Sequence, residues 1–188
     1  MAVPNINSMT VAAFDEWATR PENADKRLEY VGGEVVVLVS NDKAAKITFR
    51  INGFLFVYLA ENDIGEATGP DGGYIVMGER YIPDVAFIRY ERQTTAETRA
   101  YYPVAPDLAV EVISNKDNDQ EMRTLRKKIG SYIAAGTLVW IVDPDTRSVE
   151  VYAPGQKTIT LSEDNTLTGG DILPGFTLAV KDIFPAEK

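Results

Sequence analysis

The stretch "APDLAVEVIS", residues 105–114, decides the fold because it is typical of a strand that is buried on both faces. Alternate side chains of a strand point to opposite faces, and here both faces are largely apolar except at Glu111. A lone ionised carboxylate in such a place is costly unless a cation, a metal ion or several hydrogen bonds compensate it. We therefore expect Glu111 to have a partner, and we expect that partner to indicate the chemistry.

The length and composition predict a single domain, residues 1–188, large enough to bury a substantial core. The 45% hydrophobic and 25% charged residues are typical of a globular protein. No run approaches the roughly 20 apolar residues of a membrane span. The start, "MAVPNINSMT", lacks the charged and apolar regions of a signal peptide. We expect no membrane association and a cytoplasmic location.

Two residue types are missing, and each absence excludes chemistry. The chain has no cysteine, which excludes disulfides and thiolate metal sites. It has no histidine either, which excludes histidine-based triads, histidine-based nucleases and imidazole-bound zinc. Carboxylates, lysine, hydroxyl groups and a bound ion remain. The formal net charge of −9 opposes general attraction to nucleic acid, so a polyanionic substrate requires a local basic patch.

The first half of the chain shows alternating helix and strand patterns. Thr10 is a candidate N-cap for a short helix over 11–18. The stretch "RLEYVGGEVVVL", residues 27–38, predicts a hairpin that turns at Gly32 and Gly33. Apolar residues at helical spacing predict a long, core-facing helix over 42–61. The glycine-rich stretch "ATGPDGGYIVM" that follows has no phosphate-loop ending and favours a turn.

The second half continues the same alternation. The stretch "GERYIPDVAFIRY", residues 78–90, predicts one apolar strand, and residues 91–103 predict an exposed, polar connection. A helix is expected within 114–136, with Asp117 or Asn118 as its cap. A hairpin over 138–154 and a glycine-rich tail follow. The whole pattern predicts a mixed α/β fold, a twisted sheet with helices packed on it.

Two acids stand alone in the apolar strands of this pattern. Asp84 is the solitary acid in the middle of the strand predicted over 78–90, and Glu111 is the solitary acid in the middle of the strand predicted within 105–114. If the two strands are neighbours, the carboxylates converge and repel, so that either one takes a proton or a cation lies between them. With no nitrogen or sulfur ligand in the chain, Mg²⁺ or Mn²⁺ is the cation that fits best.

The helix that follows Glu111 offers a cation to this pair. On a projection of about 100° per residue, Lys128 lies about 60° from Leu125, beside the buried stripe. Arg126 lies at about 100° on the other flank, nearly as close, so geometry alone leaves both open. Lys127 points to solvent on the same projection.

A metal ion held by two carboxylates, with an ammonium group nearby, suits phosphodiester hydrolysis. Between Lys116 and Lys128 the sequence has five cations and three acids, which makes a modest basic strip on an acidic protein. Arg123, Arg126 and Lys127 are the candidates there for contacts with a DNA backbone.

Five stretches carry a resemblance to a known family: "RLEYVGGEVV", "IPDVAFI", "PDLAVEVIS", "KKIGSYIAAGTLVWIVDPDTRSVEVY" and "GGDILPGFTLAV". The chain resembles the Uma2 family, which lies within the PD-(D/E)xK nuclease superfamily, over nearly its whole length. The resemblance implies a restriction-endonuclease-like core, a twisted central mixed sheet flanked by helices with additional β-hairpins. It also implies restriction-type endonuclease activity on DNA, dependence on Mg²⁺, and a homodimer.

Carried over position by position, the resemblance implies a catalytic set of Glu29, Asp84, Glu111 and Lys128. Asp84 and Glu111 would hold the metal, Glu29 would assist by ligation or positioning, and Lys128 would activate water or stabilise charge. The superfamily lysine stands two residues after the glutamate, where this chain has Ile113. Many relatives also carry a histidine on the first long helix, which this chain lacks, and an aspartate where it has Thr124.

Other interpretations remain open at this point. Glu111 could form a purely structural ion pair with a helix cation. The chain could then be a non-catalytic oligomerising or binding module that retains the nuclease fold, and the acidic net charge favours this alternative mildly. A third alternative is hydrolysis of a smaller phosphoester by the same ion. The distance between Lys128 and the two acids discriminates between these classes, since a catalytic lysine must lie within hydrogen-bond or water-bridged reach.

Overall fold

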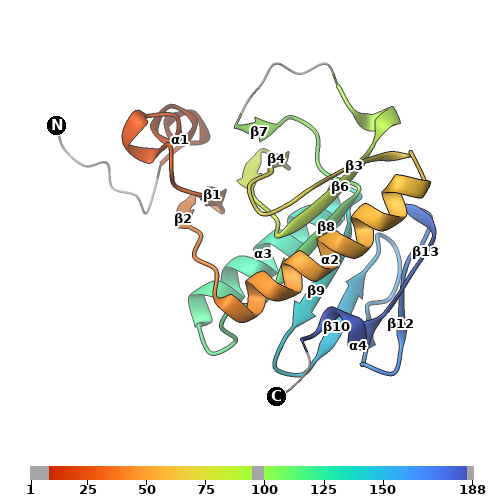
Figure 1. Cartoon of the computed structure of the whole chain (residues 1–188). Helices are drawn as coiled ribbons and strands as arrows, with labels where there is room; N and C mark the ends of the chain where they lie inside the picture. The colour runs from red at the N-terminus through yellow and green to blue at the C-terminus, as the bar shows by residue number, and fades with distance from the viewer. Residues whose placement is uncertain (1–8, 95–99, 186–188) are drawn as a thin grey trace.

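A computed structural model describes residues 9–94 and 100–185, and it shows a mixed α/β fold in which helices flank a mixed β-sheet (Figure 1). Two segments lie outside the described ranges, residues 1–8 and residues 95–99. The first belongs to the start that is predicted to lack a signal peptide, and the second belongs to the predicted polar connection. No helix in those ranges is both long enough and apolar enough to cross a membrane.

The central sheet has six strands and is mixed. In spatial order they are β11 (Ile159–Leu161), β10 (Ser148–Tyr152), β9 (Leu138–Asp143), β8 (Leu108–Val112), β6 (Val85–Arg89) and β3 (Gly65–Thr68). β8 pairs in parallel with β9 and antiparallel with β6. All five residues of β8 are buried, so the strand that carries Glu111 lies inside the sheet, as its sequence predicts.

A second sheet of five strands lies beside the first. Its order is β2 (Glu34–Val37), β1 (Leu28–Val31), β5 (Glu79–Tyr81), β4 (Gly73–Val76) and β7 (Tyr101–Tyr102). The predicted hairpin over 27–38 is present as β1 and β2. Gly32 and Gly33, with φ of 59° and 88°, form its turn, because a residue without Cβ adopts positive φ without strain.

The prediction of one strand over 78–90 is wrong. The stretch forms two strands, β5 and β6, which belong to different sheets and are separated by Ile82, Pro83 and Asp84. Pro83 has no N–H to donate to a ladder, which favours a break in pairing at this point. The N–H of Ile82 also leaves the ladder, since it donates to Glu29 Oε1 at 2.6 Å.

Four α-helices are present in the described ranges, and a side chain caps the start of the first three. They are α1 (Val11–Ala18), α2 (Asp42–Glu61), α3 (Asp119–Ala134) and α4 (Val180–Ile183). Of the two predicted caps for α3, Asn118 is the one that accepts hydrogen bonds, from the backbone N–H groups of Gln120 and Glu121. Gly136, with φ of 82°, follows the end of this helix.

The remaining segments agree with their predictions in part. The hairpin expected over 138–154 is present as β9 and β10, and the glycine-rich tail forms a further pair, β12 (Thr166–Gly169) and β13 (Leu173–Ala179). The stretch predicted as a turn contains one between β3 and β4 but also the whole of β4. The predicted polar connection contains β7 and part of a 3₁₀ turn, Tyr90–Arg92, and a second 3₁₀ turn covers Pro21–Asn23.

Two helices sandwich the central sheet. The apolar side of α2 packs on the face that carries Leu108 and Val110, whereas Leu125 and Tyr132 of α3 pack on the opposite face with Ala109. Because side chains alternate along β8, Glu111 points to the α3 side. The second sheet meets the same side through Tyr81, which is fully buried in that cluster.

Candidate active site

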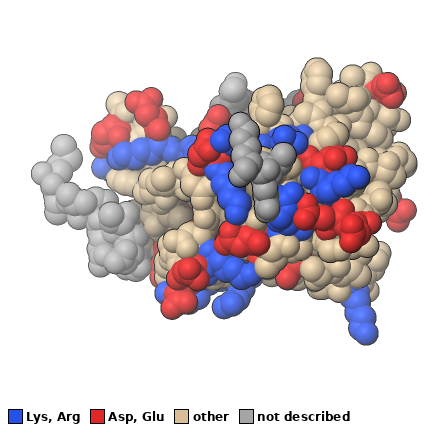
Figure 2. All heavy atoms as spheres, turned by 60° about the horizontal axis from the view of Figure 1, so that its bottom comes forward, with Lys and Arg blue, Asp and Glu red and all other residues tan. Residues whose placement is uncertain are grey.

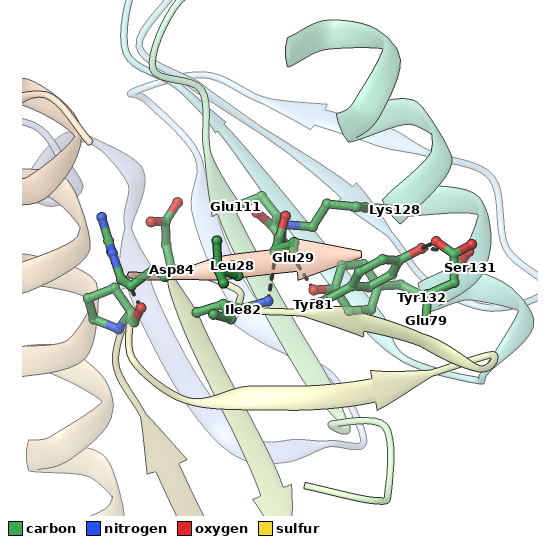
Figure 3. A network of polar contacts seen from close by, with 12 residues as sticks. Leu28, Glu29, Glu79, Tyr81, Ile82, Asp84, Glu111, Lys128, Ser131 and Tyr132 are labelled. Atoms are coloured by element: carbon green, nitrogen blue, oxygen red, sulfur yellow. Dashed lines mark hydrogen bonds and ion pairs between the residues drawn. The ribbon is translucent and has the colours of Figure 1, made fainter. Parts of the chain in front are cut away.

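The predicted site residues gather where the two sheets and α3 meet (Figure 3). Glu29 comes from β1, Glu111 from β8 and Lys128 from α3, while Asp84 lies at the bend between β5 and β6. All four line one cavity of about 770 Å³. The aliphatic segment 35–39, which leads from β2 toward α2, forms another part of the wall.

Lys128 is the cation at the centre of this group. Its Nζ lies 2.7 Å from Glu29 Oε1 and 2.7 Å from Glu111 Oε1, and the side chain is 5% exposed. The ring of Tyr81 lies below the ammonium group at 5.6 Å, where its π-electrons add a favourable interaction. Arg126, the alternative that the projection left open, is exposed. Lys128 is thus within hydrogen-bond reach of Glu111, one of the two acids that the sequence singles out.

Glu29 is buried although it lies one residue from the end of its hairpin strand. β1 is an inner strand of its sheet, between β2 and β5, so Glu29 points into the molecule and is 1% exposed. Its Oε1 accepts from both the Ile82 N–H and Lys128. Its Oε2 is buried and has no hydrogen-bond partner. An unpartnered buried carboxylate oxygen is costly, so Glu29 Oε2 is a candidate acceptor for a bound group.

Glu111 is held by two donors on the same oxygen. Lys128 contacts Oε1, and the hydroxyl group of Tyr132 donates to Oε1 at 3.0 Å. Sequence reasoning missed this role, because it counted Tyr132 only among the apolar residues of α3. Two signals were present: Tyr132 follows Lys128 by one helical turn, and a buried tyrosine hydroxyl group usually finds a polar partner.

Asp84 is anchored by the backbone of the neighbouring strand, where Val112 N–H donates to Asp84 Oδ2 at 2.7 Å. The three carboxylates thus share one arrangement. Protein donors engage one oxygen of each, whereas Asp84 Oδ1, Glu29 Oε2 and Glu111 Oε2 accept no hydrogen bond from the described residues. The unengaged oxygens are the ones free to bind something else.

Burial and charge act against each other in this site. Burial raises the pKa of Glu111 to about 8, and it raises the pKa of Asp84 as well. Burial also opposes the charge of Lys128, but Glu111 and Glu29 outweigh it and raise the pKa of the lysine. The two shifts are compatible, because Glu29 still faces the ammonium group when Glu111 takes a proton.

The atoms that could bind a metal in this site suit a hard divalent cation. They are all carboxylate oxygens, and two of those that accept no hydrogen bond belong to Asp84 and Glu111. No group of three acidic side chains within residues 9–94 and 100–185 is arranged to enclose an ion. Mg²⁺ commonly binds through one or two carboxylates and completes its shell with water and substrate, so a two-carboxylate site fits it.

The predicted DNA contacts lie on the outer side of α3. Arg123, Arg126 and Lys127 are all exposed, and Arg123 donates to the side chain of Gln120. Exposed acids of the same segment, Asp117 and Asp119, lie among them. The face drawn in Figure 2 shows positive and negative side chains intermixed rather than one continuous basic patch. A role of these residues in DNA binding stays a prediction.

The fold and the carboxylate–lysine group define a mixed α/β protein with a buried, charged cavity. The chain belongs to the Uma2 family, whose model, described as "Putative restriction endonuclease", matches residues 11–181. The resemblance drawn from the sequence motifs is therefore confirmed.

Comparison with solved structures supports the fold. A crystal structure of "a putative nuclease belonging to DUF820" from Anabaena variabilis ATCC 29413 is similar to the chain with a TM-score of 0.77 and 22% identity. The match covers 94% of this chain and 97% of that one. At this identity the likeness shows the fold. No curated protein is significantly similar to the chain.

Replacement of Lys128 by methionine tests its part in stability. At pH 9, above the pKa of Glu111, Lys128→Met leaves Glu29 and Glu111 without their cation. We expect a loss of about 3–5 kcal/mol in the free energy of unfolding, measured by urea denaturation. Lys127→Met, at the exposed neighbouring position, is the control and should change stability by less than about 0.5 kcal/mol. Equal effects of the two substitutions would contradict this account.

The pH dependence of stability tests the state of Glu111. Its pKa is about 8 in the folded protein against 4.5 ordinarily, so between these values the folded state keeps a proton that the unfolded state has released. The free energy of unfolding should therefore fall as pH rises from 4.5 to 8, by about 1 kcal/mol per pH unit from this group.

Urea denaturation across that range measures the slope. Glu111→Gln should remove this contribution, and Glu22→Gln, at an exposed position, should retain it. A slope that is unchanged in Glu111→Gln would show that Glu111 does not titrate in this window.

Proposed function

We infer that the protein is a divalent-metal-dependent endonuclease that hydrolyses phosphodiester bonds of DNA. The observation that carries this proposal is the placement of Lys128 against Glu29 and Glu111, beside Asp84, in one cavity. A structural ion pair needs one acid and one base. Here two acids contact one lysine and a third, Asp84, lines the same cavity. Each of the three keeps an oxygen that no described donor engages. The description of the family, "Putative restriction endonuclease", supports the same class of substrate.

Asp84 and Glu111 would hold Mg²⁺ or Mn²⁺ through Oδ1 and Oε2. When bound, the ion would polarise a phosphoryl oxygen and lower the pKa of a water molecule. The opposite oxygen of each carboxylate is fixed, by the Val112 N–H in one case and by Lys128 and Tyr132 in the other. Such fixing orients the ligands in advance, which is what a metal site requires of its surroundings.

Lys128 is the group that would act on the substrate. An ammonium group has three N–H donors, and Glu29 and Glu111 occupy two of them. The third can donate to a phosphate oxygen or orient the attacking water, which stabilises the charge that develops in the transition state. Glu29 contacts Lys128 and the Ile82 N–H, so it would position the lysine rather than touch the substrate.

DNA is the proposed substrate, and its backbone would contact Arg123, Arg126 and Lys127 at the edge of α3. The exposed position of all three allows such contacts. A homodimer, which the family resemblance predicts, would contain two such sites.

A non-catalytic binding module is the second candidate. The formal net charge of −9 favours it, because a negative field repels phosphates. The four-residue group would then serve only to join the two sheets and α3. Metal binding separates the two candidates, since a purely structural network has no need of an ion.

Plasmid nicking tests the proposed function. Wild-type protein should nick supercoiled plasmid with Mg²⁺ or Mn²⁺ and not with chelator, and single-stranded DNA tests the strand preference. Asp84→Asn should abolish nicking through loss of a metal ligand, and Lys128→Met through loss of the cation at the phosphate. Lys157→Met, at an exposed position outside the proposed site and DNA contacts, should remain active. If no form cleaves DNA, and calorimetry detects no metal binding, the binding-module candidate is correct instead.

Removal of one hydroxyl group tests the positioning role of Tyr132. In Tyr132→Phe the donor to Glu111 Oε1 is lost, so the carboxylate is less well oriented and Mn²⁺ affinity should fall about tenfold in a calorimetric titration. Tyr81→Phe removes a hydroxyl group that bonds Glu79 and Ser131 instead. This control should keep the affinity within about twofold. Equal affinities in wild type and Tyr132→Phe would reject the positioning role.

A further inference from the structure

Helix α2 is apolar on more than one side, although only one side is covered. Its inner side is fully buried against the central sheet through Ile47, Ile51 and Leu55. Between residues 47 and 60 the only charged side chain is Arg50. A surface helix ordinarily carries polar residues opposite its buried stripe, and a helix that is hydrophobic all round is buried all round.

The outer side of α2 presents large aromatic groups to solvent. Phe49 is 79% exposed and Phe56 is 73% exposed. The two are seven residues apart, which is nearly two full turns, so they lie on the same side of the helix. Val57, on the flank of that side, is 62% exposed. Figure 1 shows α2 on the outside of the molecule, with no described element covering this side.

We propose that this outer side of α2 is a two-fold interface at which a second copy of the chain packs its own α2 antiparallel to the first. The axis passes beside Gly53, midway between Phe49 and Phe56. Phe49 of each copy then faces Phe56 of the other, so the same surface is complementary to itself, as a two-fold interface requires. This interface stands independently of the proposed endonuclease activity.

Small residues allow the two helices to approach. Gly53 lies in the middle of the row, and a Cβ built there meets no other atom within 4 Å. Ala45 and Ala60 lie on the outer side beyond the two phenylalanines, and the antiparallel arrangement places each opposite the other. Alternation of large and small side chains is what lets ridges of one helix enter grooves of another at an axis separation of about 8–10 Å.

Charges at the two ends of the helix match in this arrangement. At 100° per residue, Lys43, Lys46 and Glu61 lie on the same flank of the outer side. The two-fold axis puts this flank of both helices on the same side of the interface and makes the helices run in opposite directions. Glu61 of the second copy therefore comes to lie beside Lys43 and Lys46. Glu61 forms no ion pair with the residues that the structure describes, whereas Lys43 and Lys46 pair only at exposed positions. Parallel helices would put like charges together.

The exposed aromatic groups supply a large part of the area that a specific dimer buries, about half of the lower limit. An aromatic side chain buries about 150–250 Å² when covered, so the four phenylalanines of two copies would remove on the order of 600 Å² from water. Specific interfaces bury about 1,200–2,000 Å² in total. Val57 and the partly exposed Phe54 add to this area.

A single introduced thiol tests the geometry, because the chain contains no cysteine of its own. In Gly53→Cys the two thiols lie next to the axis, within the span of about 7 Å between Cα atoms that a disulfide allows. Oxidation at micromolar concentration should give a covalent dimer on a non-reducing gel. Met77→Cys, equally accessible at a 63% exposed position of the second sheet, should stay largely monomeric. Equal cross-linking of the two variants would overturn the proposal.

The oligomeric state in solution gives the second readout. Light scattering should show wild-type dimers, and Phe49→Glu should give monomers that keep the wild-type circular dichroism, since Phe49 is exposed in one copy. Glu61→Lys should weaken the dimer, and addition of Lys46→Glu should restore it. A wild-type monomer at about 100 μM, well above the dissociation constants of typical specific dimers, would overturn the proposal, as would a dimer that survives Phe49→Glu.

Discussion

The ammonium group of Lys128 is the interaction on which the rest of this site depends. It lies 2.7 Å from Glu29 of the second sheet and 2.7 Å from Glu111 of the central sheet, and it comes from α3. One buried cation therefore joins three elements that are far apart in the sequence. Without it the carboxylates would have to take up protons or leave the interior, because an uncompensated charge in such surroundings is costly. The aliphatic and aromatic walls that bury the group also strengthen its interactions, since screening by water is reduced.

A break in the chain at Pro83 is the second constraint. Because β5 ends and β6 begins on either side of Ile82, Pro83 and Asp84, the chain crosses from one sheet to the other at this point. The Ile82 N–H is thereby released to Glu29, and the carboxylate of Asp84 reaches the Val112 N–H. Two of the three acids thus receive a backbone donor as a result of one interruption in pairing. The break and the site are parts of the same local structure.

Local sequence patterns, strand alternation and helical periodicity, predict the elements that carry Glu111 and Lys128. The alternation of residues 105–114 placed Glu111 in a buried strand, and the helical period placed Lys128 at the edge of a buried stripe. The two-sheet split at Pro83 was missed, because a continuous apolar run does not reveal which sheet each part joins. The burial of Glu29 depends on the packing of one sheet against another, which the periodicity of a single strand does not reveal. The helical periodicity indicates that Tyr132 is buried, but it does not show that the hydroxyl group bonds to Glu111.

The central claim is that the unengaged oxygens of Asp84 and Glu111 form a divalent-metal site. A calorimetric titration of wild-type protein and Glu111→Gln with Mg²⁺ tests this claim most directly. The account predicts saturable binding by the wild type and its loss in Glu111→Gln, which keeps the size of the side chain but removes its charge. Absence of binding by the wild type, or equal binding by both proteins, would contradict the claim and leave Lys128, Glu29 and Glu111 as a structural ion-pair network.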